Sequence, residues 1–433
     1  MERYNEYKDS GVYFIPDIPN SWQVLKAKYL FKQEKREVCP EDEIVTCFRD
    51  GQVTLRKNRR TEGFTNSMKE IGYQGVRKGD LVIHNMDAFA GAIGVSDSDG
   101  KGTPVYACCT PKRNDINQYY YCYLLRYLAR NGFILSLAKG IRERSTDFRF
   151  NDFKELYLPV PSKEEQDAIV SYIDLQSTKI DEAIAQQQKM IDLLNERKQI
   201  IINNAVTKGL NPDAPMKDSG VDWIGEIPEH WEIKKLKHVC QAFGRIGFRG
   251  YSTTDLVDEG EGCITLSPSN MRDGKMQYGR CTYLSWEKYE ESPEIKVFNG
   301  DILFVKTGST YGKSSIVEDL PLEATINPQL LVFKNFTCNN MFLANVLQST
   351  AIKTQVEISV IGGTIPTISQ QKILNYVFPF PTEDEQYAIV EYVESKSAPI
   401  NAAIKAAEKQ ISLLQERKQI IINDVVTGKV KVS

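Results

Sequence analysis

The sequence predicts an α+β fold made of two similar halves, each a globule followed by a long helix, with the two helices paired as an antiparallel coiled coil. Three observations support this prediction: an internal repeat, two glycine-free helical segments and a heptad pattern of apolar residues. Residues 193–202 read LLNERKQIII and residues 413–422 read LLQERKQIII, at an offset of 220. Solenoid units are only about 20–50 residues long, so this period marks a duplicated half with a pseudo-two-fold relation.

The repeat extends beyond the helices. Residues 158–170 align with residues 378–390 at the same offset. A second block, KDSGV, occurs at residues 8–12 and again at 217–221, and both copies continue to Ile-Pro and a Trp. We therefore expect the linker at residues 206–230 to be the repeat partner of the N-terminal stretch.

The parts that precede the helices, roughly residues 22–160 and 231–380, contain most of the glycines and short apolar runs. Residues 81–83 (LVI) and 302–305 (ILFV) each follow a Gly-Asp pair, which is typical of a strand behind a turn. We expect two α+β globules that align only in patches, with insertions inside them.

The helical segments begin after a proline. Residues 162–205 contain neither Gly nor Pro. Ser162 and Thr382 are each followed three residues later by Glu, which predicts a capping box at both helix starts. The second segment contains Pro399, where we expect a break, with the coiled coil beginning near Ile400.

Apolar residues in both segments recur at alternating spacings of four and three, which is typical of a coiled-coil seam. Such a helix could pack on its own globule or on the other repeat, and we favour the second arrangement. A pseudo-two-fold relation then makes the pair antiparallel, and about 44 residues at about 1.5 Å rise give a rod of roughly 65 Å. The predicted interface residues are Ile180, Ile184, Ile191, Leu194, Ile201, Ile400, Ile404, Ile411, Leu414 and Ile421.

Composition limits the class of protein. At 433 residues we expect two to four domains, with 41% hydrophobic and 26% charged residues. The sequence has no apolar run long enough for a transmembrane helix and no signal peptide, and its nine scattered cysteines suggest reduced thiols in the cytoplasm. The net charge of −3 means that any nucleic-acid site must come from local clustering.

Motifs for catalysis are incomplete. Residues 307–314 (TGSTYGKS) resemble a phosphate-binding loop, but Thr307 stands where the first glycine is required. We expect instead a glycine-rich turn that brings the backbone close to a partner. Asn327-Pro328-Gln329 is only a weak match to a methyltransferase loop, and the three histidines are too far apart in sequence for a His-rich metal site. The chain is predicted to be non-catalytic and to bind no metal.

Basic and amide side chains cluster in both globules. Arginine suits bidentate contacts to phosphate and to guanine, and asparagine suits adenine, whereas the alternative for each is a solvated loop or a turn. The candidate DNA-binding residues are Arg49, Arg56, Lys57, Arg59, Arg60, Asn85, Lys139, Arg142, Arg144 and Arg149 in the first globule, and Arg245, Arg249, Tyr251, Asn270, Arg272, Lys306, Ser309, Tyr311 and Lys313 in the second.

These motifs together resemble a known family. Two copies of P-x-P-x-x-x-E-Q-x-A-I-V, two helices containing L-L-x-E-R-K-Q-I-I, and K-D-S-G-V followed by I-P-x-x-W before each globule are similar to the specificity subunit of type I restriction-modification enzymes. The resemblance covers essentially the whole chain. It implies target recognition domain 1 at residues 1–161, helical repeat 1 at 162–206, a linker with target recognition domain 2 at 207–381, and helical repeat 2 at 382–433.

The resemblance also implies a function. Each target recognition domain would read one half of a bipartite double-stranded DNA site, and the helical repeats would set the spacer and dock two modification (methyltransferase) subunits. Restriction subunits, which are ATP-dependent translocases and nucleases, would join the larger assembly. S-adenosylmethionine, ATP and Mg would bind to these partners, so no cofactor is expected on this chain. Individual base contacts vary within the family, so the candidate residues rest on charge and turn chemistry.

Two alternatives stay open at this stage. The chain could be the specificity part of a fused type II-like restriction-methyltransferase, although no N-terminal catalytic domain is visible in the sequence. It could also be a coiled-coil scaffold without a DNA role, although the arginine clusters and the paired globules argue against that.

Overall fold

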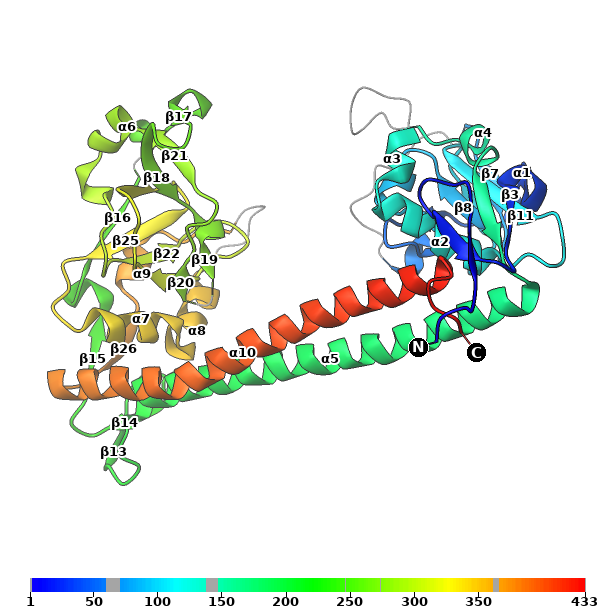
Figure 1. Cartoon of the computed structure of the whole chain (residues 1–433). Coiled ribbons are helices and arrows are strands. Elements are labelled where there is room, and N and C mark those ends of the chain that lie inside the picture. The colour runs from blue at the N-terminus through cyan, green and yellow to red at the C-terminus, as the bar shows by residue number, and fades with distance from the viewer. Residues whose placement is uncertain are drawn as a thin grey trace. The chain divides into compact units, whose positions relative to one another are not determined.

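Figure 1 shows the computed structural model, which describes residues 2–59, 71–137, 147–245, 247–272, 274–360 and 366–432. The chain forms two compact units. Unit 1 contains Met1–Gln187 and Lys409–Ser433, and unit 2 contains Gln188–Glu408. The boundary falls inside both long helices, so each unit holds a segment of each helix.

Unit 1 is built on a four-stranded antiparallel sheet with the order β4-β11-β8-β9. Its strand β8 confirms the strand predicted at residues 81–83. Side chains alternate across this strand: Leu81 and Ile83 face the main core beneath helix α2, and Val82 faces a smaller cluster on the other side. The elements of the globule are β1 (Tyr7–Asp9), β2 (Asp17–Pro19), β3 (Gln23–Lys26), α1 (Ala27–Leu30), β4 (Phe31–Glu34), β5 (Val45–Cys47), β6 (Val53–Leu55), β7 (Gln74–Val76), β8 (Leu81–His84), β9 (Ile93–Val95), β10 (Gly100–Gly102), β11 (Tyr106–Pro111), α2 (Gln118–Arg130), α3 (Phe133–Leu137), α4 (Phe150–Phe153) and β12 (Tyr157–Val160).

Unit 2 repeats this frame as β16-β25-β22-β23 and extends the sheet with β20 and β19. Strand β22 confirms the strand predicted at residues 302–305, and its Ile302 and Phe304 face the core beneath helix α7. A second sheet, β17-β21-β18-β24, corresponds in part to unit 1, where the hairpin β5-β6 pairs as β18-β21 does and Ile44 bridges to Lys101 of β10 in parallel as β18 pairs with β24. Strand β17 is the addition of unit 2 to this sheet. The elements are β13 (Met216–Asp218), β14 (Glu226–Pro228), β15 (Glu232–Lys235), β16 (Gln241–Gly244), β17 (Leu256–Val257), β18 (Gly262–Leu266), β19 (Met271–Arg272), β20 (Lys275–Met276), β21 (Thr282–Ser285), α6 (Trp286–Glu290), β22 (Ile302–Val305), β23 (Ser314–Ile316), β24 (Ala324–Ile326), β25 (Leu330–Lys334), α7 (Asn340–Gln348), α8 (Thr350–Ser359), α9 (Gln370–Leu374) and β26 (Val377–Phe380).

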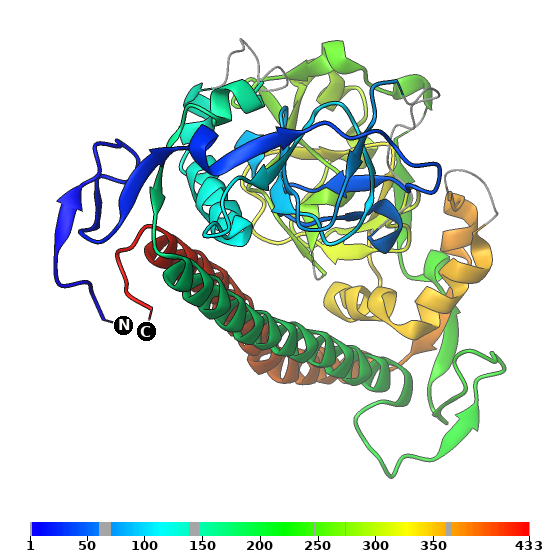
Figure 2. The same ribbon diagram turned by 90° about the vertical axis from the view of Figure 1, so that its right-hand side faces the viewer.

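The long helices α5 (Lys163–Lys208) and α10 (Glu383–Val426) run antiparallel, and Figures 1 and 2 show their segments side by side. In unit 1, Lys418 Nζ lies 2.7 Å from a carboxylate oxygen of Asp181. In unit 2, Lys198 Nζ donates to Asn401 Oδ1 at 3.0 Å. The offset of 220 maps Asp181 onto Asn401 and Lys198 onto Lys418, so the two contacts are repeat equivalents. This pairing confirms the predicted antiparallel coiled coil and its pseudo-two-fold internal repeat.

The predicted seam residues lie on the inner side of the helix pair. Ile180, Ile191, Ile400 and Ile421 are between 6% and 7% exposed. The other predicted seam residues are partly buried: Ile184, Leu194, Ile201, Ile404, Ile411 and Leu414.

The expected break at Pro399 is wrong, because helix α10 continues through this residue. Pro399 is exposed, so its ring does not enter the seam. Val393 and Ser397, which precede it, are already buried at 4% and 7% exposure. Packing on both sides of the proline therefore holds the helix together across the missing N–H group.

Both helix starts carry the predicted caps, each in part. Glu165 N–H donates to Ser162 Oγ at 3.2 Å in the first copy. In the second copy Glu385 accepts from Thr382 N–H at 3.1 Å. Each copy therefore forms one of the two reciprocal bonds of a capping box.

The ends of the two helices pack on equivalent surfaces. Gly209 and Gly428 have φ values of +73° and +76°, which end the helices in the left-handed region. A Cβ on Gly209 would lie 3.1 Å from the Trp231 ring, and one on Gly428 would lie 2.9 Å from the Trp22 ring. Lys431 N–H donates to the carbonyl of Glu2 at 2.9 Å, so both chain termini lie together in unit 1. The linker after α5 thus occupies in unit 2 the place that the N-terminal stretch occupies in unit 1.

Candidate nucleic-acid interface

The Gly-Asp turns before β8 and β22 are structural. Gly79 and Gly300 have φ values of +91° and +90°. Asp80 is 2% exposed, accepts from Arg77 N–H at 2.8 Å and pairs with Arg36 at 2.5 Å. Its bond to Arg36 raises the pKa of that guanidinium. Asp301 accepts in the same way from a backbone N–H three residues earlier, at 2.9 Å. These carboxylates fix the frame from which the neighbouring loops extend.

The described part of the first basic cluster lies on the surface with partners of its own. Arg49 is 67% exposed and Lys57 is 56% exposed. Their bonds are intramolecular: Arg49 pairs with Asp87 at 2.8 Å, Arg59 with Asp50 at 2.7 Å, Lys57 with Glu43, and Arg56 donates to Thr46 Oγ1 at 3.3 Å. Exposed ion pairs contribute only about 0–1 kcal/mol, so a phosphate can displace such a carboxylate at little cost.

Four of the candidate cations fall outside the described residues, namely Arg60 at the end of the first cluster and Lys139, Arg142 and Arg144 of the second. Arg149 is described, is 68% exposed, and has its Nε 2.5 Å from Asp147 Oδ2.

Arg149 and Asn85 line one cavity of about 580 Å³ in unit 1. Asn85 Oδ1 is buried and accepts no hydrogen bond from a described residue. The Asn85 backbone is fixed on both sides, because its N–H donates to Val105 at 2.9 Å and its carbonyl accepts from Phe148 at 2.9 Å. A ligand that donates a hydrogen bond to Oδ1 would remove the cost of burying this unpaired oxygen, which is about 1–3 kcal/mol.

Two of the candidates in unit 2 belong to the interior. Arg245 is 5% exposed and donates to the Ile326 carbonyl at 3.1 Å and to Thr325 Oγ1 at 3.0 Å. Burial lowers the pKa of its guanidinium. Asn270 is 3% exposed and its Nδ2 donates to the Arg280 carbonyl at 3.0 Å. A direct DNA contact by either side chain, which stays a prediction, would require these internal bonds to break.

The remaining candidates in unit 2 have mixed surroundings. Ser309 is exposed, Tyr251 and Tyr311 are partly buried, and burial lowers the pKa of the Lys306 amine. Their cationic neighbours have partners: Arg249 pairs with Glu294 at 3.2 Å, Arg272 with Glu408 at 2.8 Å, and Lys313 Nζ donates to the Met271 carbonyl.

The glycine-rich turn before β23 and the turn at Gly91, which holds the same place before β9, pack closely on their own globules, and their approach to a partner stays a prediction. A Cβ on Gly91, whose φ is +91°, would lie 2.8 Å from the Arg49 carbonyl. A Cβ on Gly312, whose φ is +81°, would lie 2.7 Å from Val356 Cγ1. The residue after this second turn begins strand β23 rather than a helix, so the turn lacks the helix N-terminus that phosphate-binding loops use.

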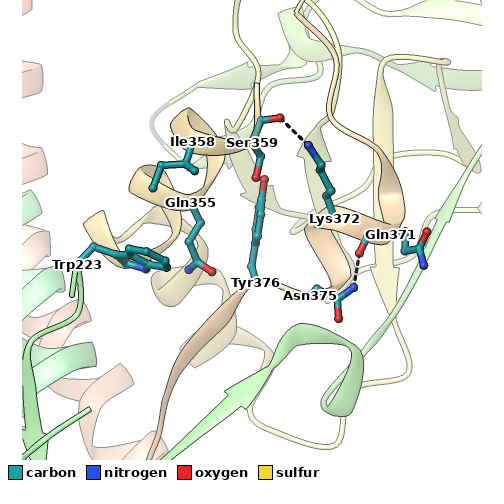
Figure 3. A pocket seen from close by; sticks show the side chains of 8 residues that line it. All are labelled: Trp223, Gln355, Ile358, Ser359, Gln371, Lys372, Asn375 and Tyr376. Atoms are coloured by element: carbon teal, nitrogen blue, oxygen red, sulfur yellow. Dashed lines mark hydrogen bonds between the residues drawn. The ribbon is translucent and has the colours of Figure 1, made fainter. Parts of the chain in front are cut away.

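A hollow of about 460 Å³ in unit 2 contains none of the candidates (Figure 3). Three of its polar side chains bond within the globule, whereas the buried Tyr376 hydroxyl has no hydrogen-bond partner among the described residues. Lys372 Nζ donates to the Ser359 carbonyl at 3.4 Å, and Asn375 Nδ2 donates to the Gln371 carbonyl at 2.8 Å. The buried Gln355 amide bonds to the backbone of Val377 in both directions, at 2.8 and 2.9 Å. This hollow therefore offers no free polar group for recognition among these three side chains.

The sequence patterns above did not indicate two pairs of exposed apolar side chains. Leu193 and Ile200 on α5 are 55% and 51% exposed, and Leu413 and Ile420 on α10 are 51% and 50% exposed. They are repeat equivalents, and each pair is spaced by seven residues. The signal was present in the repeat itself, since these residues are identical in both copies and lie outside the seam. We call each pair an outer patch.

No helix in the described ranges is both long and apolar enough to cross a membrane.

The sequence is similar to known specificity subunits. Residues 228–413 match the family model described as the type I restriction modification DNA specificity domain. The type I restriction enzyme MjaVIII specificity subunit of Methanocaldococcus jannaschii is 27% identical over 326 residues, which cover 74% of this chain and 72% of that protein. A second protein of this archaeon, provisionally named the type I restriction enzyme MjaX specificity subunit, is 24% identical. The match covers 96% of this chain and 96% of that protein.

The fold has a solved counterpart. A chain from a structure concerned with complex assembly and conformational transition of the type I R-M system has a TM-score of 0.68 and is 15% identical, with 95% of this chain and 99% of that chain covered. At this identity the likeness concerns the fold, which has two globules and two long helices in one chain. This chain is therefore similar to type I restriction enzyme specificity subunits, and its residues 228–413 match the DNA specificity domain of these proteins.

Proposed function

We propose that this chain is the sequence-specific DNA-recognition subunit of a type I restriction-modification system, and that each globule reads one half of a bipartite DNA site. The observation that carries the proposal is that the two units share a central sheet but carry different additional strands. Both units share the strand order of β4-β11-β8-β9, but unit 2 adds β19 and β20 to this sheet and β17 beside β21. An equal frame presents two globules in equivalent ways, and unlike additions let them read different base sequences.

The first globule offers phosphate contacts and base contacts in different places. Arg49, Lys57 and Arg59 lie on the surface in weak ion pairs, which suits exchange of carboxylate for phosphate. Asn85 offers a fixed, unsatisfied amide oxygen, which suits the exocyclic amine of adenine or cytosine.

The outer patches suit two modification subunits. Each unit carries one patch, Leu193 with Ile200 in unit 2 and Leu413 with Ile420 in unit 1, so one type of partner surface can bind twice. The i, i+7 spacing fits an apolar helix of the partner laid along the exposed side of the coiled coil. Restriction subunits would join through this assembly.

Catalysis is assigned to the partners. S-adenosylmethionine would bind to the modification subunits, and ATP and Mg to the modification and restriction subunits, while this chain contributes recognition and spacing. All nine cysteines are free thiols, and burial raises the pKa of Cys108 to about 12, in keeping with a cytoplasmic protein without disulfides.

Exchange of one globule tests the proposal. Residues 22–160 are replaced by the corresponding globule of a relative, the chain is combined with its modification subunits, and methylated positions are mapped by sequencing. We expect one half of the site to change while the other half and the spacer stay the same. A change in both halves at once would contradict separate reading, and methyl transfer by the chain alone would favour the fused-enzyme alternative.

A further inference from the structure

Each unit contains a cavity between a globule helix and the coiled coil, and the two cavities are repeat equivalents. The first cavity, of about 690 Å³, lies in unit 1 among α2, α5 and α10. The second, of about 260 Å³, lies in unit 2 among α7, α5 and α10. Ser177 and Asp181 line the first, and their equivalents Ser397 and Asn401 line the second. One chain thus provides two versions of the same site.

The globule helices above the two cavities can be matched residue by residue. Helix α2 begins after Asn117, whose backbone N–H donates to Gln166 Oε1 at 2.8 Å. Helix α7 begins after Asn339, whose N–H donates to the equivalent Gln386 Oε1 at 2.9 Å. Counting from these caps places Arg126 of α2 opposite Gln348, the last residue of α7, and Arg130 beyond the end of that helix.

The first cavity contains two guanidinium groups, one of which has a buried nitrogen without a partner among the described residues. Arg126 and Arg130 lie one turn apart on α2, and both line the cavity. Arg126 Nε is buried and donates to no described group. Arg130 is exposed, but the atoms around its guanidinium partly desolvate it and so lower its pKa, and the adjacent positive charge of Arg126 lowers it further. Two like charges at this spacing repel each other, so an anion between them would stabilise the pair.

The carboxylates of the first cavity are already paired with other cations. Asp181 accepts from Lys418 at 2.7 Å, and Asp50 pairs with Arg59 at 2.7 Å. The pairing of Asp50 is informative, because Arg59 belongs to the exposed basic cluster proposed above to contact DNA. The cavity and that cluster therefore adjoin at one carboxylate.

The backbone around Arg126 is shaped to its guanidinium group. Gly51 has a φ of +92°, and a Cβ there would lie 1.7 Å from Arg126 Nη1. The Gly51 N–H donates to the Phe48 carbonyl at 2.9 Å, which closes the turn. Any larger residue would displace the guanidinium, so this turn fixes Arg126 in the cavity wall.

The residue equivalent to Arg126 in the second cavity is neutral. Gln348 Nε2 donates to the Ala344 carbonyl at 3.2 Å, and its backbone carbonyl accepts from Gln199 at 2.9 Å. Where unit 1 has the guanidinium of Arg126 with an unsatisfied Nε, unit 2 has a neutral amide that is hydrogen-bonded, beside the unpaired hydroxyl of Ser397.

We propose that the first cavity binds a phosphate group between Arg126 and Arg130, and that in the working complex this group is a phosphodiester of the bound DNA. The guanidinium fork matches phosphate oxygens and accepts them in pairs. The modification subunit is expected to dock on the other side of helix α10. Gln415 and Ile422 line the cavity, whereas the outer-patch residues Leu413 and Ile420 each lie two positions earlier, which is about 200° around an α-helix. The DNA assignment rests on the proposed function.

The test replaces the two arginines of the first cavity and measures the response to phosphate. Arg126→Gln gives unit 1 the residue of unit 2, and Arg130→Gln is a second variant that leaves the packing against Gly51 intact. Lys275→Gln is the control, since Lys275 lines the second cavity and its replacement removes the same charge. The full chain is melted in inorganic phosphate and in chloride at equal ionic strength. We expect phosphate to raise the melting temperature of the wild type and the control, and to have no such effect on either arginine variant.

The source of the phosphate is identified by a second measurement on the complex with modification subunits. Removal of one cation that binds a DNA phosphate should reduce the slope of log affinity for DNA against log salt by about 0.9, with sequence preference unchanged. A reduced slope in the arginine variants supports the phosphodiester. Loss of the phosphate response with an unchanged slope supports a free phosphate ligand and overturns the DNA assignment. If neither measurement depends on Arg126 or Arg130, or if only subunit assembly weakens, the phosphate site is refuted. Failure of the wild-type complex to bind DNA would refute the proposed function, while the melting test on phosphate would still stand.

Discussion

Two neighbouring isoleucines on α10 separate the seam of the coiled coil from its outer patch. Ile421 is 6% exposed and belongs to the core of unit 1, whereas Ile420 is 50% exposed. Ile421→Ala removes three carbon atoms from a packed site and should cost about 2–4 kcal/mol of stability. For a domain of this size that corresponds to a fall in melting temperature of roughly 4–15 °C. Ile420→Ala should change stability by less than about 0.5 kcal/mol.

For association with the modification subunit the order should be reversed, with Ile420→Ala having the larger effect. If Ile420 is buried by a modification subunit, its truncation should weaken association by about 1–2 kcal/mol, or roughly 5–30-fold. Calorimetric melting of the chain and titration with the modification subunit measure the two effects on the same samples. Ile200→Ala, the repeat equivalent in unit 2, should behave like Ile420→Ala. A stable Ile420→Ala variant that assembles with wild-type affinity would refute the outer patch as a docking surface, and an undisturbed Ile421→Ala variant would refute the seam.

Three further perturbations have defined outcomes. Leu194→Asp combined with Leu414→Asp places carboxylates on both halves of the seam and should abolish assembly in gel filtration, since an unpaired buried charge costs several kcal/mol; an intact complex would contradict the seam. Glu385→Gln should reduce the loss of stability on acidification. Burial raises the pKa of Glu385, but hydrogen bonds from Trp231, His230 and Thr382 lower it overall, so the stabilisation by this carboxylate is present above its unfolded-state pKa and is lost as the pH falls through the lower folded-state pKa. Identical acid unfolding of the variant and the wild type would contradict this. A heptad inserted in both helices, within residues 187–194 and 407–414, should lengthen the spacer by about 10 Å or roughly three base pairs with the half-sites unchanged; altered half-sites with the same spacer would show that the helices do not set the distance.

The features that could be predicted from the sequence are those that local patterns determine. The strands at residues 81–84 and 302–305 follow from apolar runs behind Gly-Asp turns, and the helix pair follows from heptads repeated at an offset of 220. The break predicted at Pro399 was wrong because the effect of a proline depends on which side of the helix it occupies, and this one lies on the exposed side.

The candidate site was harder to predict because charge does not indicate burial. Arg245 and Arg49 are both arginines near turns, yet the first supports the interior of unit 2 while the second is exposed. Arg126 and Arg130 could not be singled out because they lie on a helix rich in buried Tyr and Leu, where cations usually mark the solvated side. Their unusual position appears only when α2 is placed against the coiled coil and compared with α7.

The repeat also predicts that the order of the two halves in the chain can be changed. Gly428 packs on Trp22 in unit 1 as Gly209 packs on Trp231 in unit 2, and Lys431 bonds to Glu2 beside it. The termini of unit 1 and the linker of unit 2 are thus equivalent places in the two halves. A permutant with the original ends joined by a short flexible linker, and new ends opened within residues 210–215, keeps every helix and strand intact.

We expect this permutant to melt within a few degrees of the parent and to direct methylation to the same bipartite site. Opening the chain instead between Gln187 and Gln188 cuts helix α5 at the unit boundary and should destabilise the seam, because each half-helix then loses its continuous backbone hydrogen bonding. A permutant opened in the linker that fails to fold, while the one cut in α5 survives, would show that the covalent order of the halves, and not the packing of the repeated helices, maintains the structure.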